Sequence, residues 1–380
     1  MSRLFHPSPL VAALTGGLPT AALATLVAST NLHASAVERF VALWLAAADD
    51  EAVAAATADR SAGCVGIVAP GNLFIATWQL IVEVLALGGT ARVRASGRDR
   101  AAAEVLVELL RAVDPTWAAR VEVRHFAPGD SERWAEFVHG LQAVVAQGSD
   151  EAMLALRTRL SGLTPNLPLR LHGHRLSWAF ARSSEDLIAS ADGLAHDMLL
   201  GDGRGCMTPR AVLVQGGIDD DARISAALRS ALTDAARALP PGLVPTDLAA
   251  SQRAWIEQQR FDAALAGRSF HAAMSPGFSL VVSGGDPPQQ LDAGELGPGG
   301  RLLVVRPAPA KLAALEGLCA ITSTVGLAPG STHAMAAALR AMGVRRCCDV
   351  GQMQAPPWSE TSDGQPLGQD ISVSSSASRT

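Results

Sequence analysis

The 380-residue sequence lacks several features that mark specialised classes of protein. It contains no tyrosine, and aromatic residues make up only 4% of the chain. Its net charge of -5 does not fit a nucleic-acid-binding protein, which usually carries a basic domain or stripe. The five cysteines are an odd number without a C-x-x-C pair, which indicates reduced thiols rather than a disulfide framework. We therefore expect a cytoplasmic globular protein that does not bind nucleic acid.

The sequence also lacks a convincing membrane span. Residues 73–87 form an apolar run, but the run is short for a span and contains Gln79 and Glu83, so a buried helix explains it better. Near the N-terminus, the apolar residues 9–28 follow Arg3 as in a signal peptide, but two glycines and a proline interrupt them. We therefore favour a cytoplasmic location over export.

What the chain does contain is a regular alternation of β-rich runs and helical stretches, and its length favours two domains. Repeated strand-helix units predict a parallel sheet covered on both faces, with ligands bound at the carboxyl ends of the strands. In the first block the expected strands are 64–68, 90–95, 121–126 and 142–146, and the expected helices are 73–87, 98–113, 131–140 and 150–160.

A second block of the same kind follows. Its expected strands are 169–172, 176–181, 211–215, 278–283, 301–306 and 319–324, and its expected helices are 185–200, 219–239 and 246–266. Residues 283–300 are rich in Gly, Pro and Asp and are expected to form a loop. Residues after about 364 end in a serine-rich stretch, which is typical of a disordered tail.

Three glycines within five residues lead to Cys206, in Gly-Asp-Gly-Arg-Gly-Cys. Such a loop can expose a thiol and bring a backbone N–H close to a bound carbonyl group. Arg204, two residues away, favours the thiolate, which is the reactive form of cysteine. The local sequence leaves two interpretations open: a catalytic nucleophile, or a cysteine that falls in a turn.

Two further candidate positions follow predicted strands of the first block. Asn72 comes after 64–68, where its amide can donate to an oxyanion or, alternatively, cap the next helix. Gly148 and Ser149 follow the run 142–146 and open a helix. That place suits a phosphate or a nicotinamide, but it is equally compatible with an ordinary strand-to-helix turn.

Several short motifs follow one another at characteristic separations. They are Gly71-Asn72, Arg94-Ala95-Ser96, Gly148-Ser149-Asp150-Glu151, Gly173-His174-Arg175-Leu176-Ser177, Ala195-His196-Asp197, Gly205-Cys206-Met207-Thr208-Pro209, Gly343-Val344-Arg345-Arg346, Gly351-Gln352-Met353 and Asp363-Gly364. Asn72 precedes Arg94 by 22 residues, Gly148 by 76 and Cys206 by 134. In order and spacing, over about residues 60–365, the chain resembles the aldehyde dehydrogenase superfamily, and within it the LuxC-like acyl-CoA and acyl-protein reductases.

The resemblance implies an α/β fold of the aldehyde dehydrogenase type. A Rossmann-type cofactor domain with a parallel sheet is expected over residues 1–172, for NAD(P) binding, and a second α/β domain over 173–345, for catalysis. Residues 346–380 are expected to return to the cofactor domain and then to form the tail.

The resemblance also implies catalytic roles. Cys206 is the acyl-accepting nucleophile, and Asn72 forms the oxyanion hole together with the backbone N–H of Cys206. A proton must be delivered when the aldehyde is released, and His174 and His196 are candidates because imidazole titrates near neutral pH. For each histidine, a hydrogen-bonded structural role is the alternative. His172 and His174 have no third ligand at a suitable spacing, so no metal site is expected.

For the cofactor, the resemblance implies contacts in two places. Gly148 and Ser149 line the nicotinamide end, and Arg94 and Ser96 lie at the adenosine ribose. Arg94 stands where the superfamily usually has a lysine, which keeps the charge and changes the geometry.

One departure from the superfamily concerns the choice of cofactor. A glutamate that often holds the ribose hydroxyls is replaced by Gly97, with Arg98 and Arg100 nearby. This exchange favours the 2′-phosphate of NADPH, although NADH is still possible, and a solvated basic helix start is the alternative interpretation.

A second departure concerns the reaction. Acid-forming aldehyde dehydrogenases carry a glutamate that activates water, whereas residues 169–174 contain no carboxylate. An acyl-cysteine without that base is hydrolysed slowly and can exchange with a thiol or accept hydride. The sequence therefore predicts NAD(P)H-dependent reduction of an acyl thioester to an aldehyde.

Alternatives are an acid-forming aldehyde dehydrogenase and a non-catalytic acyl-binding or scaffold member of the same fold. The expected partners are acyl-CoA or an acyl-carrier protein. A homo-oligomer, or a complex with enzymes that supply the acyl group, is compatible with the resemblance.

Overall fold

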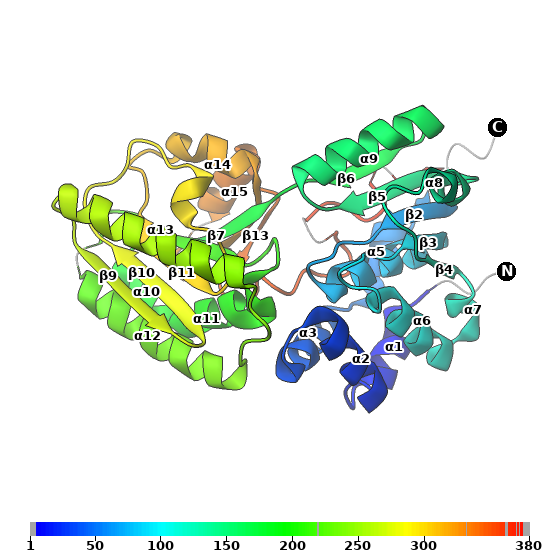
Figure 1. Ribbon diagram of the computed structural model, residues 1–380, viewed down its shortest axis with the longest axis horizontal. Helices are drawn as coiled ribbons and strands as arrows, with labels where there is room; N and C mark the ends of the chain where they lie inside the picture. Colours follow the sequence, from blue (N-terminus) through cyan, green and yellow to red (C-terminus); the bar gives the residue numbers. More distant parts are fainter. Residues whose placement is uncertain are drawn as a thin grey trace. The chain divides into compact units, whose positions relative to one another are not determined.

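The computed structural model describes residues 5–218, 220–331, 333–361, 364–369, 371 and 373–374. The chain divides into two compact units (Figure 1). Unit 1 contains Met1–His174 and Pro356–Thr380, and unit 2 contains Arg175–Ala355.

Unit 1 contains a five-stranded sheet in which all neighbouring strands are parallel. In sheet order the strands are β4 (Val121–Arg124), β3 (Thr90–Arg94), β2 (Cys64–Val68), β5 (Ala143–Gln147) and β6 (Leu169–His172). From β2 the chain builds the sheet outward to β3 and β4, and it then crosses to β5 and β6 on the other side. In open α/β sheets, ligands bind outside the carboxyl ends of the strands at such a reversal of strand order.

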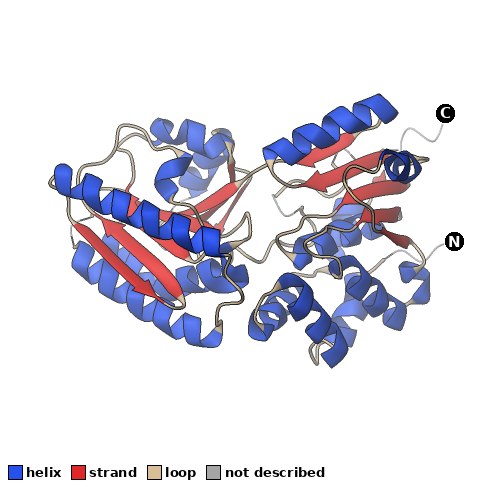
Figure 2. Ribbon diagram, viewed as in Figure 1, coloured by secondary structure: helices blue, strands red, loops and turns tan. Residues whose placement is uncertain are grey.

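Helices cover both faces of this sheet (Figure 2). On one face, α5 (Phe74–Ala86) and α6 (Ala102–Val113) pack against each other and against β2, β3 and β4, and α7 (Pro115–Ala118) packs on α6. On the other face, α8 (Ser131–Val138) and α9 (Asp150–Leu163) contribute to one apolar cluster with β2 and β5. This is the doubly wound arrangement that the alternating pattern predicts.

The helix α5 is buried almost along its whole length, and the side chains of Gln79 and Glu83 in it have polar partners. Gln79 Oε1 accepts a hydrogen bond from Trp44 Nε1 at 2.8 Å. Glu83 forms a buried ion pair with Arg170 on β6, with oxygen–nitrogen distances of 2.7 and 2.5 Å. The run 73–87 is therefore a buried helix, as predicted. Gln79 and Glu83 are tolerated inside it because each has a polar partner, whereas the buried Thr77 hydroxyl has no hydrogen-bond partner among the described residues.

Four helices precede the sheet: α1 (Pro7–Leu14), α2 (Thr20–Thr30), α3 (Ala34–Ala46) and α4 (Asp50–Thr57). The apolar stretch 9–28 folds into α1 and α2, where Leu10 and Leu26 are fully buried. Its hydrophobicity is explained by this packing. These four helices were not predicted, because the alternation of strands and helices begins only at residue 64.

The chain belongs to unit 1 again from Pro356. Trp358 is 1% exposed, its ring lies 4.2 Å from that of Trp44, and its Nε1 donates to the Trp44 carbonyl at 2.6 Å. The return that we predicted at residue 346 occurs at 356, because β13 (Arg346–Asp349) still pairs with β12 of unit 2.

The tail that we predicted after about residue 364 is partly ordered. Leu367 and Ile371 are buried, and β14 (Val373–Ser374) pairs antiparallel with β1 (Arg60–Ser61). Residues 375–380 lie outside the described residues.

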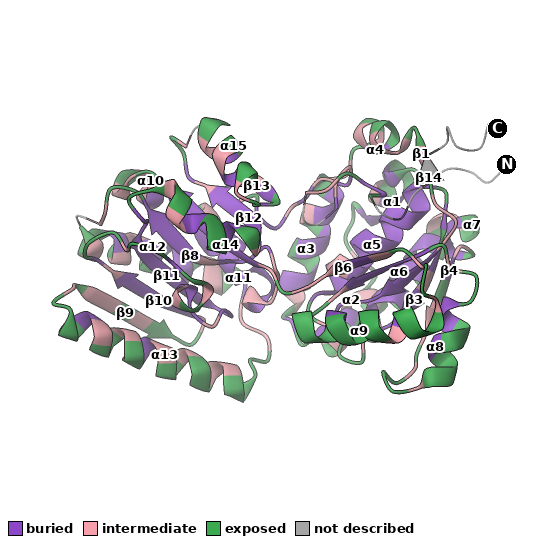
Figure 3. Cartoon of the chain, turned by 90° about the horizontal axis from the view of Figure 1, so that it is seen from above, coloured by how far each residue is buried: buried purple, intermediate pink, exposed green. Residues whose placement is uncertain are grey.

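Unit 2 contains a seven-stranded sheet in which every pair except β9–β10 is parallel. In sheet order the strands are β13, β12 (Thr322–Leu327), β7 (Leu176–Ala181), β8 (Pro209–Val214), β11 (Leu302–Pro307), β10 (Phe278–Ser283) and β9 (Phe270–Ser275). The central strands are apolar and buried, as expected for a sheet that is covered on both faces (Figure 3).

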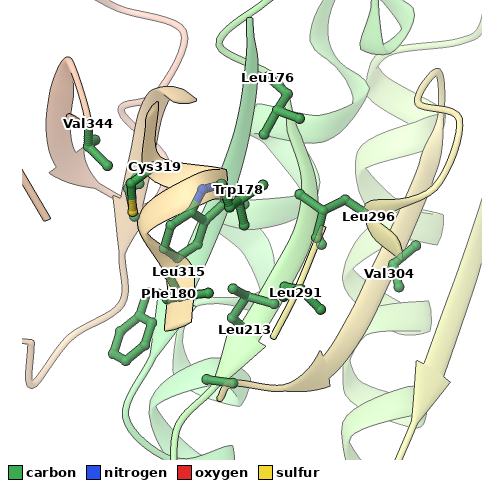
Figure 4. Close-up of a cluster of buried hydrophobic side chains, with 14 of the residues drawn as sticks. Leu176, Trp178, Phe180, Leu213, Leu291, Leu296, Val304, Leu315, Cys319 and Val344 are labelled. Atoms are coloured by element: carbon green, nitrogen blue, oxygen red, sulfur yellow. The ribbon is translucent and has the colours of Figure 1, made fainter. Parts of the chain in front are cut away.

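Two layers of helices enclose this sheet. One layer consists of α10 (Ser184–Ala189), α11 (Ala191–Leu199) and α12 (Asp221–Ala238). The other consists of α13 (Thr246–Leu265), η2 (Ala293–Leu296), η3 (Leu312–Leu315), α14 (Glu316–Ala320) and α15 (His333–Ala341). On this second face, Trp178 and Leu213 from the strands meet Leu296 and Leu315 from the covering turns (Figure 4).

Three predicted elements of the second block need correction. The run 169–172 pairs with β5 and is a strand of unit 1. The predicted helix 185–200 is broken at Ser190 into α10 and α11. The run 319–324 becomes a strand only from Thr322, because Cys319 lies in α14.

The Glu83–Arg170 pair gives a direct test of how unit 1 is held together. Glu83→Gln would leave the Arg170 guanidinium buried without a counter-charge and should lower the free energy of unfolding by about 3 kcal/mol. Urea unfolding followed by tryptophan fluorescence measures the change. The control is Glu108→Gln, which breaks the exposed Glu108–Arg111 pair and should change the free energy by less than about 0.5 kcal/mol. Equal effects of the two substitutions would contradict this assignment.

Candidate active site

In unit 1, the predicted site residues lie at the carboxyl edge of the five-stranded sheet. Asn72 follows β2, Ser96 follows β3, Gly148 follows β5 and His174 follows β6. Because all five strands are parallel, these positions share one edge, and β2 and β5 flank the reversal of strand order. The fold therefore brings together the segments that the resemblance assigns to cofactor and oxyanion binding.

The loops after β2 and β3 are packed closely together. A Cβ on Gly71 would lie 2.4 Å from Ser96 Oγ and 3.2 Å from Arg98 Cβ, so a larger residue beside Asn72 would have to displace the loop after β3 or the Ser96 side chain. Asn72 itself is exposed and is not the helix cap that we considered as the alternative, because Leu73 occupies the N-cap position of α5.

Ser149 caps the N-terminus of α9, which is the ordinary strand-to-helix turn that we considered as the alternative. Its hydroxyl caps α9 by accepting a hydrogen bond from the Ala152 amide at 3.2 Å. Gly148 is exposed between the end of β5 and this cap. A ligand at this edge would meet the backbone at the start of α9.

Arg94, the last residue of β3, lies inside unit 1 and is only 9% exposed. Its guanidinium carbon lies 5.1 Å from the ring centre of Phe126 and 5.2 Å from that of Trp134, and its Nη2 donates to the Phe126 carbonyl at 3.1 Å. Burial, and then the nearby Arg159, lower the pKa of Arg94. Arg98 and Arg100, by contrast, are exposed in the loop that follows.

His174 is the last residue of this segment of unit 1 and is exposed. Its backbone N–H donates to Asp150 Oδ1 at 2.8 Å. A Cβ on Gly173 would lie 2.0 Å from the same oxygen. The loop after β6 is thus fastened to the first turn of α9. His196, the other candidate, lies on α11 in unit 2 and is partly buried.

Cys206 lies in unit 2, in a turn between α11 and β8 at the amino edge of the sheet. The turn is closed by a hydrogen bond from the Thr208 amide to the Gly205 carbonyl at 3.1 Å. Cys206 is partly exposed, whereas Met207 and Thr208 are buried. The chain therefore presents this cysteine between a buried strand and a glycine-rich turn.

Two residues without an assigned role hold this segment. Ser177 Oγ, on the neighbouring strand β7, donates to the Cys206 carbonyl at 2.6 Å. The Asp202 carboxylate is buried and pairs with Arg301 Nε at 2.8 Å and with Arg204 Nη2 at 3.3 Å. The sequence contained Ser177 in a motif, but the roles of Asp202 and Arg301 depend on a contact between residues 99 positions apart.

A second buried network meets the same segment from the other side. Gln354 Nε2 donates to the Asp197 carbonyl at 2.9 Å and to Thr208 Oγ1 at 3.1 Å. The Asp197 carboxylate accepts the Gly351 amide at 2.5 Å. Two of the motifs, Ala195-His196-Asp197 and Gly351-Gln352-Met353, thus lie beside the residues that follow Cys206.

Three of the other four cysteines are disfavoured as thiolates. None of the five forms a disulfide. Burial raises the pKa of Cys347, and it raises that of Cys319 and Cys348 to about 12, which disfavours their thiolates at neutral pH.

The described residues contain no group of three or more His, Cys, Asp or Glu side chains that could hold a metal ion. None of the helices in this part of the chain has the length and hydrophobicity of a membrane span.

Comparison with solved structures identifies the class of fold. The fold is similar to aldehyde dehydrogenase 21 from Physcomitrella patens, at 13% identity and a TM-score of 0.68, covering 97% of this chain and 83% of that one. It is also similar to AldH from Staphylococcus aureus, at 12% identity and a TM-score of 0.66, covering 97% and 87%. A third similar structure is succinic semialdehyde dehydrogenase from Streptococcus pyogenes in complex with NADP+, at 13% identity and a TM-score of 0.64, covering 97% and 88%. The α/β fold of the aldehyde dehydrogenase type is confirmed.

Comparison with family models then identifies the family. The model described as acyl-CoA reductase (LuxC) matches residues 51–368. The chain belongs to this family and is an oxidoreductase that acts on aldehydes or acyl groups. No curated protein matches the sequence.

The buried Asp197 makes a testable contribution to the pH dependence of stability. Burial raises the pKa of Asp197 from 3.8 to about 7, against the opposing effects of backbone amides and Arg346. Between these values the folded chain retains a proton that the unfolded chain has released. Wild-type stability should therefore fall as the pH rises through this window, by up to about 1.4 kcal/mol per pH unit from this group alone.

The measurement is the free energy of unfolding of the wild type minus that of Asp197→Asn, from pH 4 to 8. This difference should decrease with pH up to about 7 and then become constant, because Asn does not titrate. A difference that is flat or that increases over this range would show that the carboxyl is ionised in the folded chain throughout.

Proposed function

We propose that the protein reduces an acyl thioester, either acyl-CoA or an acyl-carrier protein, to an aldehyde through an acyl group carried on Cys206. The observation that carries the proposal is the partly exposed Cys206, held in a glycine-rich turn by its own backbone contacts, in a chain of the acyl-CoA reductase family. The other cysteine thiols with a clear pKa shift are disfavoured as thiolates, which supports the same choice.

In the first step, the Cys206 thiolate attacks the thioester carbonyl, and a new carbon–sulfur bond forms. We assign the negative oxygen of this intermediate to the Cys206 backbone N–H and the Asn72 amide. When the intermediate collapses, the donor leaves as a thiolate with the electrons of its carbon–sulfur bond, and the acyl group stays on Cys206.

A nicotinamide cofactor fits the carboxyl edge of the sheet in unit 1. This edge has a reversal of strand order between β2 and β5, the exposed start of α9 beside Gly148, and two exposed arginines in the loop after β3. When bound, the cofactor supplies the hydride that reduces the acyl group. We propose NADPH rather than NADH because Arg98 and Arg100 are exposed at this edge and can pair with a 2′-phosphate.

After reduction, the oxyanion on Cys206 collapses: the bond between Cys206 and the substrate carbon breaks, and the aldehyde and the Cys206 thiolate are released. The one proton that the overall reaction consumes goes to the donor thiolate that left in the first step. We assign its delivery to His174, which is exposed and lies on a loop fixed by the contact between its backbone and Asp150. Residues 169–174 supply no carboxylate that could activate water. This favours aldehyde release over acid formation, and the ratio of acid to aldehyde among the products tests that alternative.

Cys206→Ala should reduce the rate of thioester reduction by about 10³-fold or more, because no other group replaces the nucleophile. The measurement is oxidation of NADPH at 340 nm with an acyl-CoA as substrate. Cys347→Ala is the matched control, since it removes another partly buried thiol of unit 2 and should leave the rate within about twofold. Reduction that continues in Cys206→Ala would overturn the proposal.

Arg98 is expected to bind the 2′-phosphate of NADPH, since it is exposed and Arg94 is enclosed by aromatic rings. Arg98→Glu should raise the KM for NADPH by about tenfold and leave the KM for NADH nearly unchanged. Arg111→Glu, on the exposed side of α6, is the control for the change in overall charge. Equal increases for both cofactors would exclude a contact with the 2′-phosphate.

A further inference from the structure

The turn that leads to Cys206 has an unfavourable backbone conformation. Gly201, Asp202 and Gly203 have φ values of 72°, 57° and 67°, so three successive residues are left-handed. Glycine adopts this conformation freely, but an L-residue such as Asp does so at a cost. A Cβ on Gly203 would lie 2.0 Å from the Gly300 carbonyl oxygen, so the turn is also pressed against the chain before β11.

The Asp202 side chain explains how this turn is held. It is 5% exposed, and its carboxylate accepts hydrogen bonds from Arg301, Arg204 and the Gly242 amide. Arg301 is itself fixed, because its two terminal nitrogens donate to the carbonyls of Gly277, Leu239 and Pro240. The buried ion pair between Asp202 and Arg301 therefore holds the turn against the start of β11.

Ser177 fixes the other end of the same segment. It is fully buried on β7, and its hydroxyl donates to the Cys206 carbonyl. The Ser177 hydroxyl oxygen in turn accepts a hydrogen bond from the Thr324 amide of β12 at 3.0 Å. The peptide group of Cys206 is thus connected to two adjacent strands of the sheet through one side chain.

We propose that Ser177 and Asp202 are positioning residues that set the location of the Cys206 thiol for attack on the thioester. The proposal rests on the function that we propose for Cys206. Ser177 holds the carbonyl of Cys206, and Asp202 holds the turn four residues earlier, so neither needs to touch the substrate. A displacement of a reacting atom by about 1 Å can slow a reaction on the order of 100-fold.

The experiment compares Ser177→Ala and Asp202→Asn with the wild type. Asn tolerates a left-handed backbone well, so Asp202→Asn removes the charge and leaves the conformational preference of the turn. The rate constant for acylation of Cys206 is measured by intact mass spectrometry after rapid mixing with an acyl-CoA in the absence of cofactor. The kcat and the KM for NADPH are measured in parallel.

The chain offers a matched control for each variant. Ser323→Ala removes another fully buried serine hydroxyl, on β12, and this hydroxyl has no hydrogen-bond partner among the residues that the structure describes. Glu83→Gln breaks a buried carboxylate–arginine pair of unit 1. The controls therefore reproduce the loss of a buried hydroxyl and of a buried ion pair, but without contact to the Cys206 segment.

We expect both test variants to lower the acylation rate constant and kcat by roughly 10- to 100-fold, with the KM for NADPH unchanged within about twofold. Both controls should acylate at the wild-type rate when measured well below their unfolding midpoints. A purely structural role would lower the stability of Ser177→Ala and Asp202→Asn, as the loss of the buried ion pair does in Glu83→Gln, without slowing acylation of the folded protein.

The proposal is overturned if folded Ser177→Ala and Asp202→Asn acylate as fast as the wild type, or if the controls are slowed equally. If Ser177→Ala does not fold, Asp202→Asn against Glu83→Gln decides the question. Acylation that persists in Cys206→Ala would instead refute the proposed function, so the two failures are distinguishable.

Discussion

The hydrogen bond from the Ser177 hydroxyl to the Cys206 carbonyl determines where the segment between α11 and β8 meets the sheet of unit 2. This segment cannot be a regular helix or strand, because it has to leave a thiol accessible directly before a buried strand. It contains three successive left-handed residues, Gly201, Asp202 and Gly203. Side chains from distant parts of the chain hold the segment in place, namely Ser177, Asp202 with Arg301, and Gln354 with Thr208.

The candidate site in unit 1 is built differently from the Cys206 segment of unit 2. The carboxyl edge of the sheet offers short loops, a helix start and exposed cations, with few buried polar contacts. Arg94 is the exception, since its guanidinium packs against the rings of both Phe126 and Trp134, which also contact each other, and this packing holds α8 against the sheet. The contact with the adenosine ribose that the resemblance implies for Arg94 is therefore better assigned to the exposed Arg98 and Arg100.

Much of this organisation could be predicted from the sequence. The strands of unit 1 were identifiable because buried parallel strands are short apolar runs, and the helices between them have a clear period. The N-terminal helices and the edge strands β9 and β13 were missed, since they show no such alternation. The strand pattern alone listed β6 with the second block, although the domain boundary that we expected at residue 172 places it in the first, where it pairs with β5.

The residues of the candidate site could be predicted only where they lie in short sequence motifs. Cys206, Asn72 and Gly148 follow from the order and spacing of short motifs. The ion pair of Asp202 with Arg301 does not, because its partners are 99 residues apart and a charged pair has no local pattern. Ser149 is the opposite case. Its role as a helix cap depends only on neighbouring residues, and it was one of the two interpretations that the sequence allowed.

The central claim is that an acyl group is carried on Cys206. The most direct measurement is peptide mapping by mass spectrometry after incubation of the wild-type protein with an acyl-CoA, before and after addition of NADPH. The account predicts an acyl mass on the peptide that contains Cys206, which disappears with NADPH as aldehyde is released. An unmodified Cys206 peptide while aldehyde is still produced would contradict it.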